Sequence, residues 1–297
     1  MNAWQIGGLG MEIYQQMQNE MKQMAKDMLD KGTANCVIAW RKGDFPEYPE
    51  PSFFTKADDV EQNMVYNKHC SSNLSKYIIK ANKEYEKTLI FLKPCDSFSY
   101  NQLLKEHLVD KNKTRAIGIC CEGDVNELCK TCTKHTHVIE AVLGNNEDMP
   151  RETTDKNARF EGVKEIEEMP ADARYDFWRA QLSKCMRCNA CRQGCPVCNC
   201  KKCVFDSGQY DTQQKANSSS FEEQMFHVIR AFHVAGRCTD CGQCARACPQ
   251  DIRLELFNRK YIKDINELYG EHQAGADVDE SGPLLDFKHD DYDPSGI

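Results

Sequence analysis

The sequence predicts an α/β domain with a small parallel sheet, followed by a helix-rich domain that holds most of the cysteines. Two observations predict this order. Short apolar runs alternate with helix-like stretches up to residue 120, which is the pattern of a parallel sheet covered by helices. Beyond residue 180 that pattern gives way to two runs of closely spaced cysteines. A chain of 297 residues is long enough for two modest domains.

The first domain can be followed element by element. Residues 11–31 repeat apolar side chains at helical spacing, and the pattern ends at Gly32, as is common at a helix C-terminus. The mostly apolar run at 88–93 predicts a buried strand. In chain order we expect a helix at 11–31, a strand at 34–40, helices at 58–66 and 73–85, a strand at 88–93, a helix at 97–108 and a strand at 114–120.

The rest of the chain changes character after residue 144, where polar and charged residues without periodicity predict a linker. A helix at 171–184 is expected to lead into the first cysteine run. A second helix at 221–235 separates the two runs, and its periodicity predicts an inward face of Phe221, Met225, Ile229 and Phe232. We therefore expect an α/β domain at 1–150, a linker at 151–170, a cysteine-rich domain with an inserted helix at 171–262, and a C-terminal helix and acidic tail at 263–297.

The two cysteine runs share one spacing, Cys-x2-Cys-x2-Cys-x3-Cys-Pro, from Cys185 to Pro196 and from Cys238 to Pro249. Bacterial-type ferredoxins hold [4Fe–4S] clusters with this spacing, and the fourth cysteine of each run serves the other cluster. Structural zinc sites use paired C-x2-C units instead. The second domain is thus predicted to be a helix-rich bacterial ferredoxin-like dicluster domain that carries electrons. Its expected ligands are Cys185, Cys188, Cys191 and Cys248 for cluster 1, and Cys238, Cys241, Cys244 and Cys195 for cluster 2.

Further cysteines follow the predicted strands of the first domain. Cys95 lies just past one strand, and Cys120 and Cys121 lie at the end of the next. Because the carboxyl ends of parallel strands meet at one edge, these cysteines should lie close together, within reach of Cys129-x2-Cys132. Three interpretations stay open from spacing alone: a third [4Fe–4S] cluster on Cys95, Cys121, Cys129 and Cys132, ordinary buried cysteines, or a zinc site that pairs Cys129 and Cys132 with Cys120 and Cys121.

Three more cysteines, Cys198, Cys200 and Cys203, come directly after the first run. Their spacing is compatible with extra metal ligands, for a further cluster or for zinc with a fourth ligand from elsewhere. It is equally compatible with thiols that pack beside a cluster and tune its potential.

Composition and hydropathy argue against a nucleic-acid-binding, membrane-spanning or secreted protein. The formal net charge of −8 argues against a nucleic-acid-binding surface, and from Glu271 onward eight acidic residues accompany one lysine. No stretch approaches the roughly 20 apolar residues of a membrane span. Residues 1–22 contain no apolar core of a signal peptide. Eighteen cysteines without a secretion signal suit a reducing compartment, so we expect a cytoplasmic protein.

Several motifs carry a resemblance to a known family. Lys93-Pro-Cys-Asp-Ser-Phe-Ser, Ile117-Gly-Ile-Cys-Cys-Glu-Gly-Asp-Val and Cys129-Lys-Thr-Cys132 follow the motif order of the iron–sulfur beta-subunit family of formate dehydrogenases and deazaflavin-reducing hydrogenases. The stretch from Tyr175 to Cys203 is similar to short heterodisulfide-reductase-associated members, which end in a ferredoxin-type 2[4Fe–4S] domain.

The resemblance implies that the N-terminal cysteines hold a cluster. The family glycine after a Cys-Glu pair corresponds to Gly123, which favours Cys121 over Cys120 as the ligand. The resemblance further implies an electron-transfer subunit of an anaerobic complex. This subunit would lie between a formate dehydrogenase- or hydrogenase-type catalytic subunit and a flavin-containing or heterodisulfide-reductase-like partner.

A flavin-bearing oxidoreductase subunit that reduces a deazaflavin or nicotinamide is the alternative. The sequence contains no G-x-G-x-x-G phosphate cradle, and Gly7-Gly8-Leu-Gly10 is a weak substitute because no strand precedes it. The leading prediction therefore contains two [4Fe–4S] clusters and a third in the first domain, without FAD and without a catalytic residue.

Overall fold

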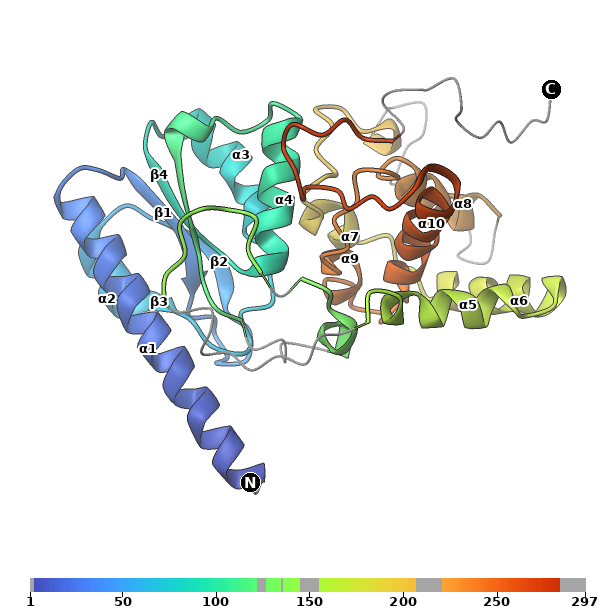
Figure 1. The fold of residues 1–297 in the computed structure, drawn as a ribbon, viewed down its shortest axis with the longest axis horizontal. Helices are drawn as coiled ribbons and strands as arrows, with labels where there is room; N and C mark the ends of the chain where they lie inside the picture. Colours follow the sequence, from blue (N-terminus) through green and yellow to red (C-terminus); the bar gives the residue numbers. More distant parts are fainter. Residues whose placement is uncertain (1–2, 122–126, 135, 145–154, 207–220, 284–297) are drawn as a thin grey trace. The chain divides into compact units, whose positions relative to one another are not determined.

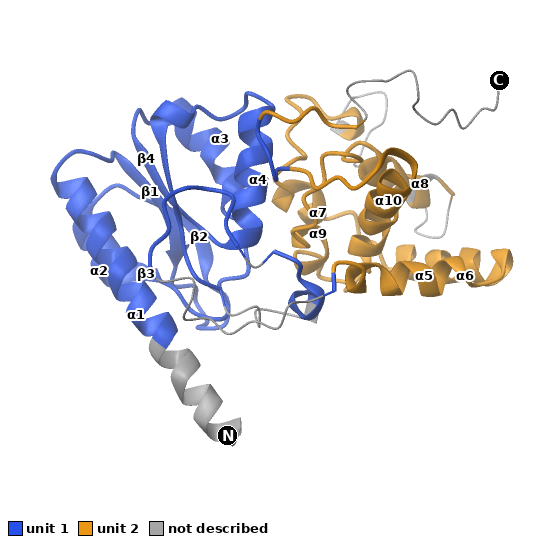
Figure 2. Ribbon diagram, viewed as in Figure 1, with its two compact units in different colours: residues 1–155, 275–278 blue, residues 156–274, 279–297 orange. Residues whose placement is uncertain are grey.

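The computed structural model describes residues 3–121, 127–134, 136–144, 155–206 and 221–283. The chain divides into two compact units, one of residues 1–155 and 275–278 and one of residues 156–274 and 279–297 (Figure 2). Part of the expected linker, residues 151–154, and the end of the acidic tail, residues 284–297, lie outside the described residues.

The first unit is an α/β structure with helices on both faces of one sheet (Figure 1). Its helices are α1 (Ala3–Asp30), α2 (Ala57–Asn63), α3 (Ser75–Glu84) and α4 (Pro94–Lys105), with short 3-10 helices η1 (Lys111–Lys113) and η2 (Glu127–Thr131). Its strands are β1 (Cys36–Arg41), β2 (Glu50–Phe54), β3 (Met64–Val65), β4 (Thr88–Leu92) and β5 (Thr114–Gly118).

The sheet is mixed rather than purely parallel. Strands β1, β4 and β5, which the sequence predicts, pair in parallel in that order. Strands β2 and β3 add to β1 in antiparallel orientation. Strand β2 was not predicted because Pro51 interrupts its strand-like pattern. Proline is tolerated in a sheet mainly on an edge strand, which is where β2 lies. The helix predicted at 58–66 includes the residues of β3, which in the structure pair with β1 at Trp40 and Arg41.

The core of this unit is apolar and includes the predicted inner face of α1. Tyr14, Met17, Met21 and Met28 are buried against the sheet. All five residues of β4 are buried, as expected for a central strand covered on both faces. Gly32 adopts a φ of +64° and Thr33 donates a backbone hydrogen bond to Met28, which ends the helix.

The carboxyl edge of the sheet is held by a returning segment. Leu92 pairs with Gly118 at the ends of β4 and β5. Nε2 of His137 lies 3.1 Å from both the Leu92 and the Ile119 carbonyl oxygens. A Cβ on Gly118 would lie only 2.7 Å from the His137 ring, so only glycine leaves room for the imidazole. The segment after Cys132 is therefore tied back to this edge.

The second unit is helical. Its elements are η4 (Ala158–Phe160), α5 (Glu161–Glu167), α6 (Ala171–Leu182), α7 (Ala190–Gly194), η5 (Val204–Asp206), α8 (Phe221–Phe232), α9 (Gln243–Arg246) and α10 (Leu254–Tyr269). The range expected to be a linker thus contains η4 and α5, whose Val163 and Ile166 pack with Leu256 of α10. Helix α10 begins inside the range 171–262 and ends beyond it. Among the described helices, none is long and apolar enough to cross a membrane.

Candidate metal centres

The two cysteine runs adopt the same backbone conformation. Arg187 and Asp240, at matching positions of the two runs, have φ of 55° and 53°. Asn189 and Gly242, again at matching positions, have φ of 62° and 70°. This left-handed region is uncommon for residues other than glycine. Each loop then enters a short helix, α7 or α9, so the sequence duplication is also a structural one.

The first cavity is lined by cysteines of both runs. Its wall contains Cys185, Cys188 and Cys191 from the first run and Cys248 from the second, around an empty volume of about 310 Å³. Leu254 and Ile252 from the start of α10 and the preceding loop add apolar wall, as does Phe226 of α8. The four cysteines grouped by the ferredoxin spacing therefore share one cavity.

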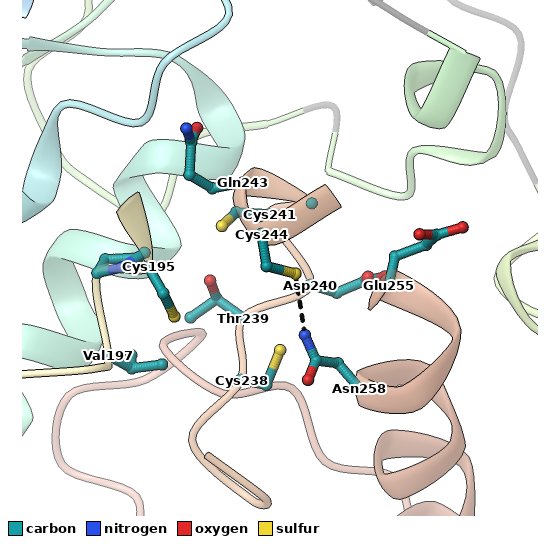
Figure 3. Close-up of a pocket in the computed structure, with 12 residues that line it drawn as sticks. Cys195, Val197, Cys238, Thr239, Asp240, Cys241, Gln243, Cys244, Glu255 and Asn258 are labelled. Atoms are coloured by element: carbon teal, nitrogen blue, oxygen red, sulfur yellow. Dashed lines mark hydrogen bonds between the residues drawn. The ribbon is translucent and has the colours of Figure 1, made fainter. Parts of the chain in front are cut away.

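The second cavity has the reciprocal composition. It is lined by Cys238, Cys241 and Cys244 from the second run and by Cys195 from the first, around about 330 Å³. The sulfur atoms of these four cysteines lie around the cavity in Figure 3. The crossing of the fourth cysteine follows from the close packing of α7 against α9, which places the end of each run beside the start of the other.

Burial raises the pKa of at least one thiol in each cavity. The pKa of Cys191 and of Cys195 is raised to about 11, and that of Cys244 to about 12. Burial is the largest cause in each case, and neighbouring cysteines add to the effect. Thiolates, not thiols, bind metals, so such groups give up their protons when a metal takes their place. Four thiol donors around an apolar cavity fit an iron–sulfur cluster.

Two buried side chains support this fit because their polar atoms lack partners. Arg230 of α8 is 2% exposed, and none of its three guanidinium nitrogens has a hydrogen-bond partner within the described structure. His227, which lines the first cavity, is equally buried, and neither ring nitrogen has a partner there. Burial, with the positive charges of Arg230 and Arg187, lowers the pKa of His227 to about 3. Unpaired buried groups are costly, and a negatively charged cluster would compensate them.

Hydrogen bonds to sulfur occur in both loops. The Arg187 amide donates to Sγ of Cys185 at 3.3 Å, and the backbone of Asp240 makes the matching bond to Cys238. Nδ2 of Asn258, on α10, donates to Sγ of Cys244 at 3.2 Å (Figure 3). Hydrogen bonds to ligand sulfur hold the thiolate and shift the potential of a bound cluster.

A buried ion pair braces the second loop. Oδ1 of Asp240 lies 2.9 Å from Nε of Arg259, and its Oδ2 lies 3.7 Å from a guanidinium nitrogen of Arg159. The side chains are at most 8% exposed. Burial disfavours the charged form of Arg259, yet the interaction with Asp240 holds the pKa of Arg259 above its ordinary value. Asp240 thereby ties the cysteine loop to η4 and α10.

The trio after the first run is not gathered into one group. Cys198 packs with Cys195, Val197 and Val234 beside the second cavity. Cys200 is exposed and Cys203 is half-buried. Across the described ranges, no three His, Cys, Asp or Glu side chains come together as a single-ion site. A [4Fe–4S] cluster spaces its thiolates more widely, because each one binds a different iron.

Two of the four cysteines predicted to hold a third cluster follow the carboxyl ends of neighbouring strands. Cys95 and Cys121 each come three residues after the paired ends of β4 and β5, Leu92 and Gly118. Cys129 lies in η2, and Cys132 donates a backbone hydrogen bond to its carbonyl at 3.1 Å. Residues 122–126 are outside the described part of the chain. The phosphate-cradle candidate at Gly7, Gly8 and Gly10 lies inside α1 rather than in a loop.

The inserted helix α8 presents a different face from the one its apolar periodicity predicts. Phe221 and Phe232 are 71% and 64% exposed, whereas Phe226, His227 and Arg230 are buried. The prediction from apolar periodicity was wrong because α8 packs beside the cysteine-lined cavities and not only against an apolar core. Arg230, Asn258 and His227 were therefore not among the residues predicted from the sequence. The available signal was the i, i+3 spacing of His227 and Arg230.

Comparison with known proteins agrees with this geometry. Residues 181–252 match the family model described as a 4Fe-4S dicluster domain. The chain is 33% identical over 87 residues to the F420-dependent formate dehydrogenase subunit beta of Methanocaldococcus jannaschii, covering 29% of this chain and 22% of that protein. It is 36% identical over 109 residues to the F420-dependent formate dehydrogenase 1 subunit beta of Methanococcus maripaludis, covering 36% and 26%.

A structural similarity is weaker. A chain in the F420-reducing [NiFe] hydrogenase complex from Methanosarcina barkeri aligns with a TM-score of 0.29 and 13% identity, covering 36% of this chain and 41% of that one. The chain spans about a quarter of the length of the two formate dehydrogenase relatives. The resemblance predicted from the motifs is confirmed over these matched parts: residues 181–252 match a 4Fe-4S dicluster domain, and part of the chain is similar to beta subunits of F420-dependent formate dehydrogenases.

Proposed function

We propose that the protein is an electron-relay subunit of a larger redox complex, with two [4Fe–4S] clusters in its second unit. The observation that carries the proposal is the pair of cavities, each lined by three cysteines of one run and the fourth cysteine of the other. Accordingly Cys185, Cys188, Cys191 and Cys248 would hold cluster 1, and Cys238, Cys241, Cys244 and Cys195 would hold cluster 2. Bound clusters supply one-electron chemistry.

The chain's own residues would make these sites stable and accessible. Phe226, Ile252 and Leu254 exclude water from the first cavity, which protects a cluster from hydrolysis and strengthens nearby electrostatic interactions. Cys188 is the exposed residue among the eight proposed ligands. It therefore offers the shortest path between the first site and a partner at the surface, and we assign it to the point where electrons enter or leave.

A third cluster on the first unit is part of the proposal, with Cys95, Cys121, Cys129 and Cys132 as ligands. Two features support it. Cys95 and Cys121 follow neighbouring parallel strands at the same offset from a paired position. The segment that follows Cys132 is fixed to the same edge by His137 and by a hydrogen bond from the Val138 amide to Ser97 Oγ at 3.2 Å.

The partners we propose come from the relatives. Two of them are, by name, beta subunits of F420-dependent formate dehydrogenases, so one partner proposed here is a catalytic subunit of the formate dehydrogenase or hydrogenase kind. The other would be a flavin-containing or heterodisulfide-reductase-like subunit. Cys198, Cys200 and Cys203 are proposed to pack beside the clusters, since Cys198 already lies against Cys195.

Electron uptake and delivery test this function. Anaerobically purified protein should be bleached in the visible region by reduced methyl viologen, accept at least about two electrons per chain, and return them to free FMN. The double variant Cys188→Ala/Cys241→Ala, altered in both proposed sites, should accept far fewer. Wild-type protein that takes up no electrons would contradict the relay. Flavin released on denaturing the purified chain would favour the flavin-bearing alternative instead.

A further inference from the structure

The inserted helix α8 carries a buried charge with no protein partner. Arg230 is 2% exposed, and its Nε and both terminal nitrogens lack a hydrogen-bond acceptor among the described residues. Arginine stays charged in proteins, and an isolated buried charge is strongly unfavourable. Its neighbours on α8, Phe226 and Ala231, are apolar and buried, so they offer no compensation. Helix α8 therefore buries a positive charge for which the side chains of the described part of the chain provide no hydrogen-bond acceptor.

Arg230 lies four residues after Phe226, which lines the first cavity, and four residues before Val234, which packs with Cys195 and Val197 of the second. Its charge interacts with ligand cysteines of both proposed clusters. Cys191 belongs to the first quartet, whereas Cys195, Cys238 and Cys244 belong to the second. Burial opposes the charge of Arg230, but its attraction to these four sulfurs holds its pKa above the ordinary value. One guanidinium thus acts on both cavities.

Two other cations near the cysteine runs, Arg187 and Arg237, are held differently. Arg187 stacks on the Phe226 ring at 4.0 Å and faces the first cavity with His227. Arg237, next to Cys238, is half-exposed and donates to the His233 carbonyl and to Asn199. Solvent and these partners weaken the field of Arg237 at the clusters. Arg230 is 2% exposed and has no hydrogen-bond acceptor within the described ranges.

We propose that Arg230 is a positioning residue that serves as a shared positive charge for the two clusters, raising the reduction potential of both. The inference rests on the proposed function, because it requires a cluster in each cavity. Each cluster gains one negative charge when it takes up an electron, so a fixed buried cation stabilises the reduced form more than the oxidised form. Since Arg230 acts on both sites, it also offsets the repulsion between two reduced clusters.

Potentials of variants test the inference. Arg230→Met removes the charge at similar length, Arg230→Lys keeps it, and Arg237→Met removes a screened charge beside the same loop. Midpoints would be measured by redox titration followed by electron paramagnetic resonance, with iron and sulfide counted in each sample. Arg230→Met should lower the equilibrium constant for reduction of each cluster by about tenfold or more. For a one-electron couple, that change lowers each midpoint potential by about 59 mV. Arg230→Lys should stay near wild type, and Arg237→Met should change the constant by less than about twofold.

Stability without clusters provides a second readout in case Arg230→Met binds clusters poorly. Cluster-free Arg230→Met should have a higher Tm than cluster-free wild type, because it no longer buries an uncompensated charge. A lower Tm would make Arg230 an ordinary packing residue and overturn the inference. Unchanged midpoints in cluster-loaded Arg230→Met, or a shift at one cluster alone, would overturn it as well. Wild-type protein with fewer than two clusters would instead contradict the proposed function itself.

Discussion

Replacing Cys248 with alanine is expected to remove the cluster held by the first cysteine run, although Cys248 belongs to the second run. The reason is geometric: Cys248 lines the cavity of Cys185, Cys188 and Cys191, not that of Cys238, Cys241 and Cys244. Without its fourth thiolate, one iron of the first cluster loses its protein ligand. Iron and sulfide analysis of the Cys248→Ala protein should show a loss of about four of each per chain.

Double variants make the crossed assignment testable. Adding Cys188→Ala to Cys248→Ala alters the same cavity twice, so the iron content should fall little further. Adding Cys241→Ala alters both cavities, so about eight iron atoms should be lost. The reverse pattern would mean that each run holds its own cluster, and it would contradict the assignment of both quartets.

Replacing Cys121 with alanine is expected to remove the third cluster, whereas replacing its neighbour Cys120 is not. Cys121 occupies the position, relative to β5, that Cys95 occupies relative to β4. Cys120 instead belongs to the apolar core of the first unit, and the hydroxyl of Tyr66 bonds its backbone carbonyl rather than its thiol. Iron should therefore fall by about four atoms per chain in Cys121→Ala.

Cys120→Ala is the matched control for this prediction. It should retain wild-type iron and lose only the packing of a buried thiol, about 1 kcal/mol of unfolding free energy. Equal iron in Cys121→Ala and wild type would leave the first unit without a cluster. Loss of iron in Cys120→Ala but not in Cys121→Ala would move the ligand by one residue.

The parallel part of the fold could be predicted because its strands are apolar and continuous. Burial of β4 on both faces leaves a run of apolar side chains that local patterns reveal. Strand β2 contains Pro51 and Ser52 and gains its stability from pairing with β1, which a local pattern does not encode. Helix α5 is seven residues long, and helices this short depend on tertiary packing.

The two groups of cysteines that share the cavities could be predicted because cluster ligation imposes a spacing on the sequence. The groups around them could not, because their positions depend on packing between distant segments. Asn258 reaches Cys244 from α10, and Arg230 reaches both quartets from α8. Helical periodicity assigns the inward face to the apolar residues of α8, yet Phe221 and Phe232 are exposed. A helix that buries polar and charged side chains such as His227 and Arg230 need not turn its most apolar face inward.

Cluster stoichiometry tests the central claim most directly. Wild-type protein, purified without oxygen, would be analysed for iron and acid-labile sulfide per chain and, after full reduction, for integrated electron paramagnetic resonance intensity. Two clusters in the second unit predict at least about eight iron and eight sulfide per chain, and a third cluster raises each count to about twelve. Fewer than about eight of either, or zinc in place of iron, would contradict an account in which the two cysteine-lined cavities hold a pair of clusters.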